Sequence, residues 1–433
     1  MSGWYRRIWR WHFYAGLIAL PFVALLSVTG MIYLFKPSLD HWSERAYDHL
    51  ALSGPAHSLD EQIAAALAAT PGARLKALEW RADPQDAARV LLIDQAGTPL
   101  RVLVRPDTLA ILSAAPERDL TSEFVKRIHG ELLSGDTGAI LVETAGGWGI
   151  VLFGTGLYLW WPRNARGLGG ILYPRRGRLL RDLHAVTGFW ISVLALFFLV
   201  SALPWTKVWG GAFKQVQAYS AGASSRDWTT GPASEHAQHM HELAGAASSA
   251  PEGFDRVAAL VPELNLAAPV LIAPPGPMSA NWAIRSDSQN RTARTSVEID
   301  PEGAVVHPRG FSDKSLIDRI VGVAISAHEG HLFGWVNQAL GVVTGLGLLT
   351  MSVSALLMWW KRRPAGVVGA PPAPDRASRM GSAMGGLVIL LALLLPTLGI
   401  SLVLISALER LVLRRIAPVS HFLGLEPRHA EAH

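Results

Sequence analysis

The chain contains no cysteine among its 433 residues, and charged side chains make up only 17% of it. The absence of cysteine excludes disulfides, thiolate metal sites, iron–sulfur clusters and haem attached through cysteine. The short basic segments contain no dinucleotide-binding fingerprint, so any oxidation of NAD(P)H would require a partner protein. Half of the residues are hydrophobic, which together with the low charge indicates a membrane protein.

The net charge of +5 comes mainly from arginine clusters beside apolar runs. Short basic segments at residues 162–183 and 361–380 are typical of cytoplasmic loops, so we interpret the charge as a topology signal and expect no nucleic acid partner. The first apolar run, residues 13–35, is too long for a signal-peptide core, and we expect a cytoplasmic N-terminus. The long polar inserts, 37–128 and 206–327, then lie outside.

One stretch of sequence occurs twice, as His129–Arg163 and as His328–Arg363. In both copies 31 positions separate the histidine from a Trp-Trp pair (160 − 129 and 359 − 328), and basic residues follow. The apolar part is long enough to cross a hydrocarbon core of about 30 Å. The tryptophan pairs are typical of interfacial anchors. Equal spacing in two copies indicates an internal repeat.

The repeat also includes an earlier helix in each half. W-H-F-Y-A-G contains His12 and Gly16, and L-H-A-V-T-G contains His184 and Gly188. A histidine and a glycine four residues apart share one helix face, where the glycine leaves room for a bulky neighbour. The two halves have the same orientation, so a pseudo-twofold axis along the membrane normal relates them.

This symmetry brings the four repeated histidines together as two pairs. His12 and His184 would meet near the cytoplasmic side, and His129 and His328 near the outer side. A lone intramembrane histidine is usually a packing residue, but two facing imidazoles suit a six-coordinate haem iron. Zinc is a weaker alternative, because it requires three or four ligands at one point. Two haems across a membrane would form an electron path.

Other histidines have alternative interpretations. His331 lies one turn from His328 and would be the ligand in its place, a hydrogen-bonding neighbour of the ligand, or a contact for an external iron complex. Its first-half counterpart is Leu132, so symmetry favours His328. A further cluster is interpreted as a solvated helix face rather than a metal site; it comprises His236, His239 and His241.

Each insert has the pattern of a small α+β module. Ser58 to Glu61 forms a capping box before a helix, and a second helix is expected at 235–247. Hairpin turns are expected at 95–98 and 300–303. The expected strands are 75–80, 88–93, 100–104 and 110–113 in the first insert, and 270–272, 281–285, 292–299 and 304–307 in the second.

A fifth apolar run covers residues 385–408 and contains Pro396, which a membrane helix tolerates as a kink. A single crossing here would place the C-terminus outside, together with Arg410, Arg414 and Arg415. That placement opposes the charge pattern of the other loops.

The sequence resembles the PepSY-associated transmembrane helix proteins, also called iron-regulated membrane proteins. The resemblance rests on W-H-F-Y-A-G, I-H-G-E-L-L-S-G-D-T-G, D-L-H-A-V-T-G-F-W, H-E-G-H-L-F-G and the terminal W-W-P-R and W-W-K-R-R. It covers nearly the whole chain. It implies a bacterial inner-membrane reductase that binds haem b and reduces ferric siderophores in the periplasm. Mapped onto this sequence, the motif histidines are His12, His129, His184 and His328. PepSY modules elsewhere are associated with peptidase inhibition.

We therefore expect an α-helical membrane protein: a four-helix haem-binding bundle built from two parallel repeats, a fifth C-terminal helix and two periplasmic PepSY-like modules. Its two b-type haems would pass electrons from a quinol or a cytoplasmic reductase to a ferric siderophore, with no acid–base catalytic residue. The alternatives are an anchor whose modules restrain a periplasmic protease and an accessory subunit of a metal transporter. The expected segments are helix 1–36, module 37–127, helix 128–161, loop 162–183, helix 184–205, module 206–327, helix 328–360, loop 361–383, helix 384–413 and tail 414–433.

The spacing also predicts where the outer pair lies. An unbroken helix of 31 residues would be about 46 Å long, which exceeds the hydrocarbon core of about 30 Å. The outer pair would therefore lie at the outer rim, unless the helices break at Gly135, Gly138, Gly334 or Gly341. His331 and Trp335 are the expected contacts for a substrate that docks there.

Overall fold

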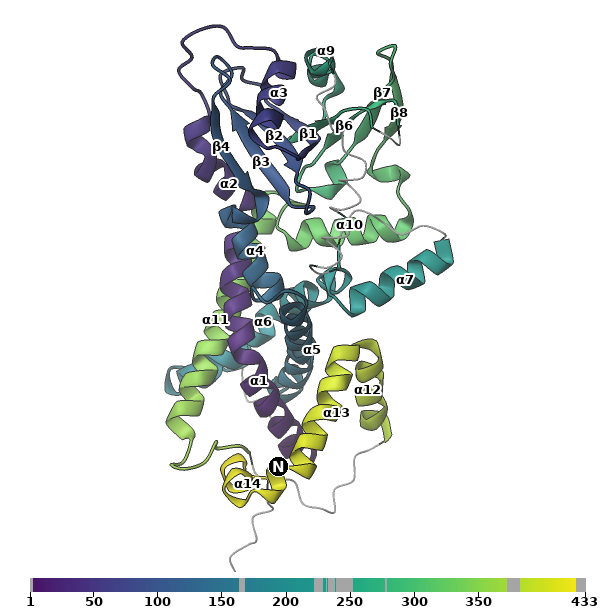
Figure 1. Ribbon diagram of the computed structural model, residues 1–433. Helices are drawn as coiled ribbons and strands as arrows, with labels where there is room; N and C mark the ends of the chain where they lie inside the picture. Colours follow the sequence, from purple (N-terminus) through teal and green to yellow (C-terminus); the bar gives the residue numbers. More distant parts are fainter. Residues whose placement is uncertain are drawn as a thin grey trace, which may run out of the picture. The chain divides into compact units, whose positions relative to one another are not determined.

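The computed structural model describes residues 3–162, 168–221, 229–230, 232, 238, 252–276, 279–371 and 382–425. The chain forms two compact units (Figure 1). The first comprises Met1–Met31, His129–Ser224 and Ala339–His433, and the second comprises Ile32–Ile128 and Ser225–Gln338. Each unit therefore combines segments from both halves of the repeat.

The first unit consists of helices. The long ones are α1 (Gly3–Tyr33), α5 (Gly135–Trp160), α6 (Leu179–Ser201) and α11 (Trp335–Arg362). Among the described residues, five helical segments are long and apolar enough to cross a membrane, and the fifth is Pro396–Arg415. The protein is therefore a membrane protein with several spanning helices, as expected.

Small residues allow these helices to pack closely. Ala15 and Ala19 of α1 pack with Trp148 of α5 in one apolar cluster. A second cluster joins Phe153 of α5 to Ile191 and Ala195 of α6, with Leu348 and Met351 of α11 against it. A Cβ added at Gly149 would lie 3.3 Å from Leu199. Close approach at small residues is the usual basis of helix association in lipid.

The repeated stretch is not one helix in either copy. His129 lies in the last turn of α4 (Thr121–Glu131), and α5 begins only at Gly135. His328 is the last residue of α10 (Leu316–His328), and α11 begins at Trp335. Gly135 and Gly334 have positive φ angles of 59° and 61°, which glycine adopts without strain. The breaks at these two glycines are confirmed, whereas Gly138 and Gly341 lie inside helices.

The expected single fifth helix is wrong in its path. The segment forms α12 (Ser382–Leu394) and α13 (Pro396–Leu411), which lie side by side as a hairpin (Figure 1). A Cβ at Gly399 would lie 2.6 Å from the carbonyl oxygen of Ala392, seven residues earlier, a closeness that requires a reversal of the chain. Pro396 lacks the N–H that would continue α12. The proline therefore marks a turn rather than a kink.

The hairpin returns the C-terminal segment to the start of α1. Arg10 donates to the carbonyls of Pro371 and Gly424 at 2.6 and 2.8 Å, and Tyr14 donates to that of Leu423 at 2.5 Å. Residues 417–423 form α14 (Ala417–Leu423). The segment up to residue 425 therefore lies at the same end of the membrane helices as the start of α1, not at the opposite end that a single crossing would give. Helix α7 (Trp209–Ala221) completes the helices described in this unit.

The second unit contains one sheet, and the two expected inserts share it. The strand order is β4-β3-β2-β1-β5-β6-β7-β8, with every neighbouring pair antiparallel. The strands are β1 (Arg74–Trp80), β2 (Ala88–Ile93), β3 (Pro99–Val104), β4 (Ile111–Pro116), β5 (Val270–Ala273), β6 (Trp282–Ser286), β7 (Ser296–Ile299) and β8 (Val305–Arg309). The order is symmetric about the β1–β5 seam, where Leu78 pairs with Ile272. Two separate modules would each leave an unpaired edge at this seam.

Two helices cover one face of the sheet, and each caps the other. Asp60 of α3 (Leu59–Ala69) accepts the backbone N–H of Phe254 at 2.9 Å, at the start of α9 (Phe254–Ala258). In return, Asp255 accepts the N–H of Leu59 at 3.0 Å. Ile63 and Phe254 are fully buried in the same core. The reciprocal caps and the shared core make the two inserts one folding unit.

The local predictions for the inserts are largely confirmed. The capping box at Ser58 and Glu61 is present. Both hairpin turns contain a glycine at positive φ, 77° at Gly97 and 90° at Gly303. Strand β7 is shorter than expected because residues 291–293 form a 3-10 turn. The unit also contains α2 (Lys36–Glu44). The helix expected at 235–247, with His236, His239 and His241, lies outside the described residues.

Candidate functional site

His12 and His184 face each other inside the helical unit. His12 lies on α1 and His184 on α6, and their ring centres are 6.2 Å apart with the ring planes at 84°. Residues about 170 positions apart in the sequence are thus brought together, as the repeat predicts. A metal bound between two imidazoles lies about 2 Å from each nitrogen, and the ring centres then lie about 6.4 Å apart. The observed spacing matches that arrangement.

Both rings are oriented by hydrogen bonds at Nδ1. Nδ1 of His12 lies 2.9 Å from the hydroxyl of Thr155 on α5. That hydroxyl donates its single proton to the carbonyl of Val151 at 2.7 Å, so it must accept the proton of His12. Nδ1 of His184 lies 3.0 Å from the carbonyl of Met351 on α11, which can only accept. Each ring therefore keeps Nε2 as an unprotonated nitrogen, the form that binds a metal.

His129 repeats this arrangement at the other end of α1. Its Nδ1 lies 2.9 Å from the hydroxyl of Thr29, which donates to the carbonyl of Leu25 at 2.9 Å. Thr29 must therefore accept the proton of His129, and Nε2 is again free. Burial lowers the pKa of His129 to about 4, so the ring is neutral at pH 7. Three of the four predicted histidines thus have the tautomer that metal ligation requires.

A glycine stands beside each threonine and makes room for the histidine. A Cβ at Gly156 would lie 3.2 Å from Cε1 of His12, and one at Gly30 would lie 3.1 Å from Cε1 of His129. Both distances are tighter than ordinary contacts, so the histidines pack directly on helix backbone. The two Thr-Gly pairs, Thr29-Gly30 and Thr155-Gly156, are a signal that was missed at the sequence level. Each pair combines a hydrogen-bond acceptor with the space for a ring.

The remaining predicted residues lie around the α10–α11 connection of the second unit. His328 ends α10 and is partly exposed. His331 follows in the connection, where its backbone N–H donates to Ser326 at 2.8 Å, and burial lowers the pKa of its side chain. Trp335 begins α11 and is 77% exposed. Asn337 fixes the connection by donating to the carbonyl of Ala327 at 2.8 Å.

The donor set fits b-type haem. Haem iron takes two axial imidazoles in six-coordinate electron-transfer sites, and the rings of His12 and His184 have the spacing and the free nitrogens for it. Hydrogen bonds at the far ring nitrogen are what orient a ligating histidine. Ala15, Ala19 and Gly16, where a Cβ would lie 3.8 Å from Leu152, keep the α1 face small. The chain contains no cysteine, so a haem held here would be a noncovalent type, such as haem b.

A buried acid in α5 has a structural role that the sequence pattern did not reveal. The carboxylate of Glu143 is only 6% exposed. It accepts the backbone N–H groups of Val208 at 2.8 Å and Trp209 at 3.1 Å, which lie at the start of α7. A carboxylate at a helix N-terminus satisfies amides that the helix itself leaves unpaired. Glu143 therefore fixes α7 to the membrane helices.

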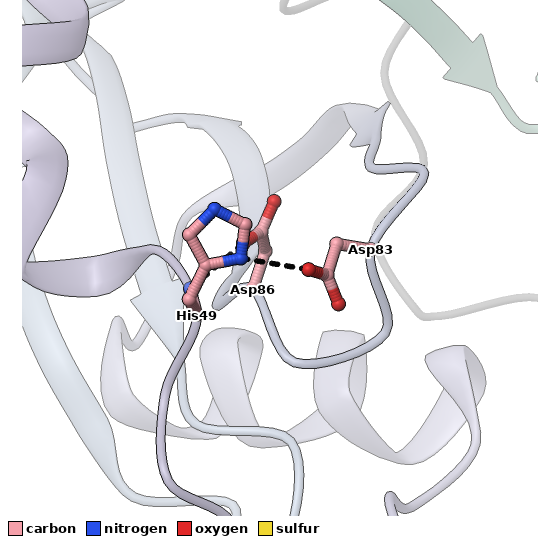
Figure 2. Close-up of side chains that lie close together, drawn as sticks. All are labelled: His49, Asp83 and Asp86. Atoms are coloured by element: carbon pink, nitrogen blue, oxygen red, sulfur yellow. Dashed lines mark hydrogen bonds and ion pairs between the residues drawn. The ribbon is translucent and has the colours of Figure 1, made fainter.

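A cluster of polar side chains lies on the surface of the second unit (Figure 2). Nδ1 of His49 lies 2.7 Å from Asp83, and Asp86 accepts the backbone N–H of His49 at 2.9 Å. Arg81 donates to the other oxygen of Asp86 at 2.6 Å, and Gln85 donates to the other oxygen of Asp83 at 2.8 Å. All four carboxylate oxygens already have donors. We interpret the cluster as an ion-pair network of the loop.

Comparison with known proteins supports the resemblance noted from the motifs. The chain matches the family described as PepSY-associated TM region over residues 9–362. A search of curated proteins found no match. The family match includes all four repeated histidines, both Thr-Gly pairs and the shared sheet. The chain belongs to the family of proteins with a PepSY-associated TM region.

Proposed function

We propose that the protein is an inner-membrane di-haem b oxidoreductase that passes electrons across the membrane to a ferric siderophore in the periplasm. The observation that carries this proposal is the pair His12 and His184. Their ring centres are 6.2 Å apart, and each Nδ1 faces an acceptor on a neighbouring helix. A packing histidine has no need of an opposed partner with the same tautomer.

The outer haem is assigned from the repeat and from one histidine with the same surroundings. His129 occupies the position in the first half that His328 occupies in the second. Its hydrogen bond to Thr29 and its contact with Gly30 match those of His12 with Thr155 and Gly156. We propose His129 and His328 as the outer axial ligands. His331 remains the alternative to His328, and Leu132 at its first-half counterpart favours His328.

The residues of the chain hold the cofactor rather than perform proton chemistry. Haem b, when bound, supplies one-electron transfer. The histidines orient it, the glycines leave room beside the rings, and the apolar helix faces exclude water. Two histidines holding each haem would leave no position on its iron for the substrate. The substrate would therefore dock outside the membrane helices rather than bind the iron.

The chemistry of siderophores explains why reduction would release iron. Oxygen donors hold the hard Fe(III) ion far more tightly than Fe(II). An electron delivered outside would therefore weaken the complex without any acid or base from the protein. We propose His331 and Trp335 as docking contacts, because Trp335 is 77% exposed and the neighbouring Phe333 is 66% exposed. The electron donor would be a quinol or a cytoplasmic reductase.

An absorbance spectrum and a haem assay test this proposal first. The purified protein should show a b-type Soret band and two haems per chain. The dithionite-reduced protein should then be reoxidised by ferric siderophores in a stopped-flow experiment. A protein without a Soret band after expression with sufficient haem would contradict the proposal. That result would favour an anchor for a periplasmic protease or an accessory subunit of a metal transporter.

A further inference from the structure

A basic cleft lies between the start of α6 and the end of α11. It has a volume of about 480 Å³, and its lining includes Arg178 and Arg181 from the α6 side and Lys361 and Arg362 from α11. Leu180 and Met358 provide apolar lining between these cations. We call this feature the α6–α11 cleft. It lies within the helical unit and includes none of the predicted haem ligands.

Most of the positive charge of the cleft has no acidic partner among the described residues. No acidic side chain is among its lining residues. The neighbouring acid, Asp182, has a fully buried carboxylate that accepts from Arg175 at 2.7 Å and from Arg181 at 3.2 Å. In the described part of the chain, Arg178 and Lys361 have no acidic partner. Clustered cations without counter-charges favour an anion from outside the chain.

The cleft lies where lipid headgroups are expected. Arg178 lies near the first residue of the candidate span Arg176–Trp205. Lys361 lies near the last residue of the candidate span Trp335–Arg362. Beside them, Leu179 is 52% exposed and Trp360 is 67% exposed. Exposed tryptophan next to basic residues is typical of the membrane interface. A ligand in this cleft would meet cations at one end and apolar side chains at the other.

The first half of the repeat retains only two of the four cations, because Arg6 stands in the place of Arg178 and Arg163 in the place of Arg362. By the register of His12 with His184, Trp9 stands in the place of Arg181. By the register of Trp160 with Trp359, Pro162 stands in the place of Lys361. Arg10, close by in the first half, is engaged by backbone carbonyls of the C-terminal segment. The complete set of four cations is therefore present in one half only.

We propose that the α6–α11 cleft binds the phosphate headgroup of one anionic phospholipid. The four cations would hold the phosphate, and the acyl chains would leave along Leu180 and Met358 into the bilayer. Basic pockets between membrane helices on the cytoplasmic side have the chemistry for such headgroups. A lipid fits better than a free phosphate ion, because the cleft continues from the cations onto apolar, membrane-exposed residues. The proposal is independent of haem binding.

Native mass spectrometry of the full-length protein, released from a nonionic detergent, tests the proposal. The probes are phosphatidylglycerol, phosphatidylcholine and inorganic phosphate. The wild type should retain one phosphatidylglycerol in preference to phosphatidylcholine. Arg178→Gln combined with Lys361→Gln should weaken this retention by about tenfold or more, since each cation near the headgroup contributes to binding. The exchanged pair Arg178→Lys with Lys361→Arg should retain the lipid.

The matched control is Arg176→Gln combined with Arg415→Gln, which removes the same charge at exposed positions outside the cleft. It should leave lipid retention unchanged. Equal loss in the control and the cleft variant would show a general effect of surface charge and overturn the proposal. Displacement of the lipid by millimolar inorganic phosphate would indicate a free-anion site and also overturn it. Elution on size exclusion and an unchanged circular dichroism spectrum verify that each variant is folded.

Discussion

The hydroxyl of Thr155 lies 2.9 Å from Nδ1 of His12 and accepts its proton, because that hydroxyl already donates to Val151. Thr29 has the same relation to His129. A threonine on the neighbouring helix therefore decides which nitrogen of each histidine is available. We propose that this relation marks His12 and His129 as ligand positions, and that the carbonyl of Met351 has the same role for His184.

Thr155→Val should lower the affinity for the inner haem. Valine keeps the shape of threonine but cannot accept the proton of His12. Loss of such a partner typically lowers metal affinity by about 10–100-fold. Haem titration of the haem-depleted protein measures the change. Thr144→Val is the matched control, because Thr144 lies on the same helix and, among the described residues, donates to the carbonyl of Ile140 alone. Equal affinities in the two variants would refute the role of Thr155.

Replacement of single histidines should remove single haems. His12→Ala or His184→Ala should empty the inner site and leave the outer haem, and His129→Ala or His328→Ala should do the converse. The pyridine haemochrome assay counts haem per chain for each variant. Two haems in all four variants would disprove the ligand assignment.

His331→Ala should leave the haem content unchanged, because the repeat places the outer ligand at His328. The same assay decides between the two residues. Loss of the outer haem in His331→Ala, with retention in His328→Ala, would make His331 the ligand.

Gly156→Ala should disturb the inner site through packing alone. The added Cβ would lie 3.2 Å from Cε1 of His12, and the ring is restrained by Thr155. Overpacking of this kind costs roughly 1–3 kcal/mol, which a haem titration would detect. Gly154→Ala is the control on the same helix, since a Cβ there meets nothing within 4 Å. If both variants bind haem like the wild type, the close approach has no role in the site.

Reporter fusions should place both termini in the cytoplasm. Helix α14 contacts Arg10 and Tyr14 at the start of α1, so a C-terminal fusion should behave like one after Arg176. A fusion after Ser113 should behave as periplasmic. An alkaline phosphatase and green fluorescent protein pair reports the two sides. A periplasmic C-terminal reporter would contradict the helical hairpin of α12 and α13.

Trp335→Ala should slow electron transfer to bulky ferric siderophores without loss of haem. An exposed tryptophan is a frequent hot spot of binding, with a typical cost of roughly 1–2 kcal/mol on removal. Stopped-flow reoxidation at several siderophore concentrations measures the effect, which should appear in the concentration dependence. Trp42→Ala is the control, because Trp42 is 61% exposed on α2. Deletion of one insert is unsuitable, since it would also remove half of the shared sheet.

Several features of the protein follow from local sequence. Two copies of one stretch, with the same spacing from histidine to the Trp-Trp pair, indicated the repeat. The repeat then identified the four candidate histidines. Strands β2 and β3, the capping box at Ser58 and the turns at Gly97 and Gly303 were predicted because short-range hydrogen bonds and φ preferences decide them. The membrane spans were predicted because a long apolar run in lipid must satisfy its backbone as a helix.

Only the tertiary structure decided the rest, because it depends on contacts between distant residues. The seam between β1 and β5 joins two inserts separated by two membrane helices in sequence, and no local pattern encodes which strand edges pair. The reversal at Pro396 depends on the packing of α13 against α5, where a Cβ at Gly147 would lie 3.1 Å from Leu398. The partners of His12 and His129 lie 143 and 100 residues away. Sequence supplied the histidines, and the packing of helix against helix supplied their orientation.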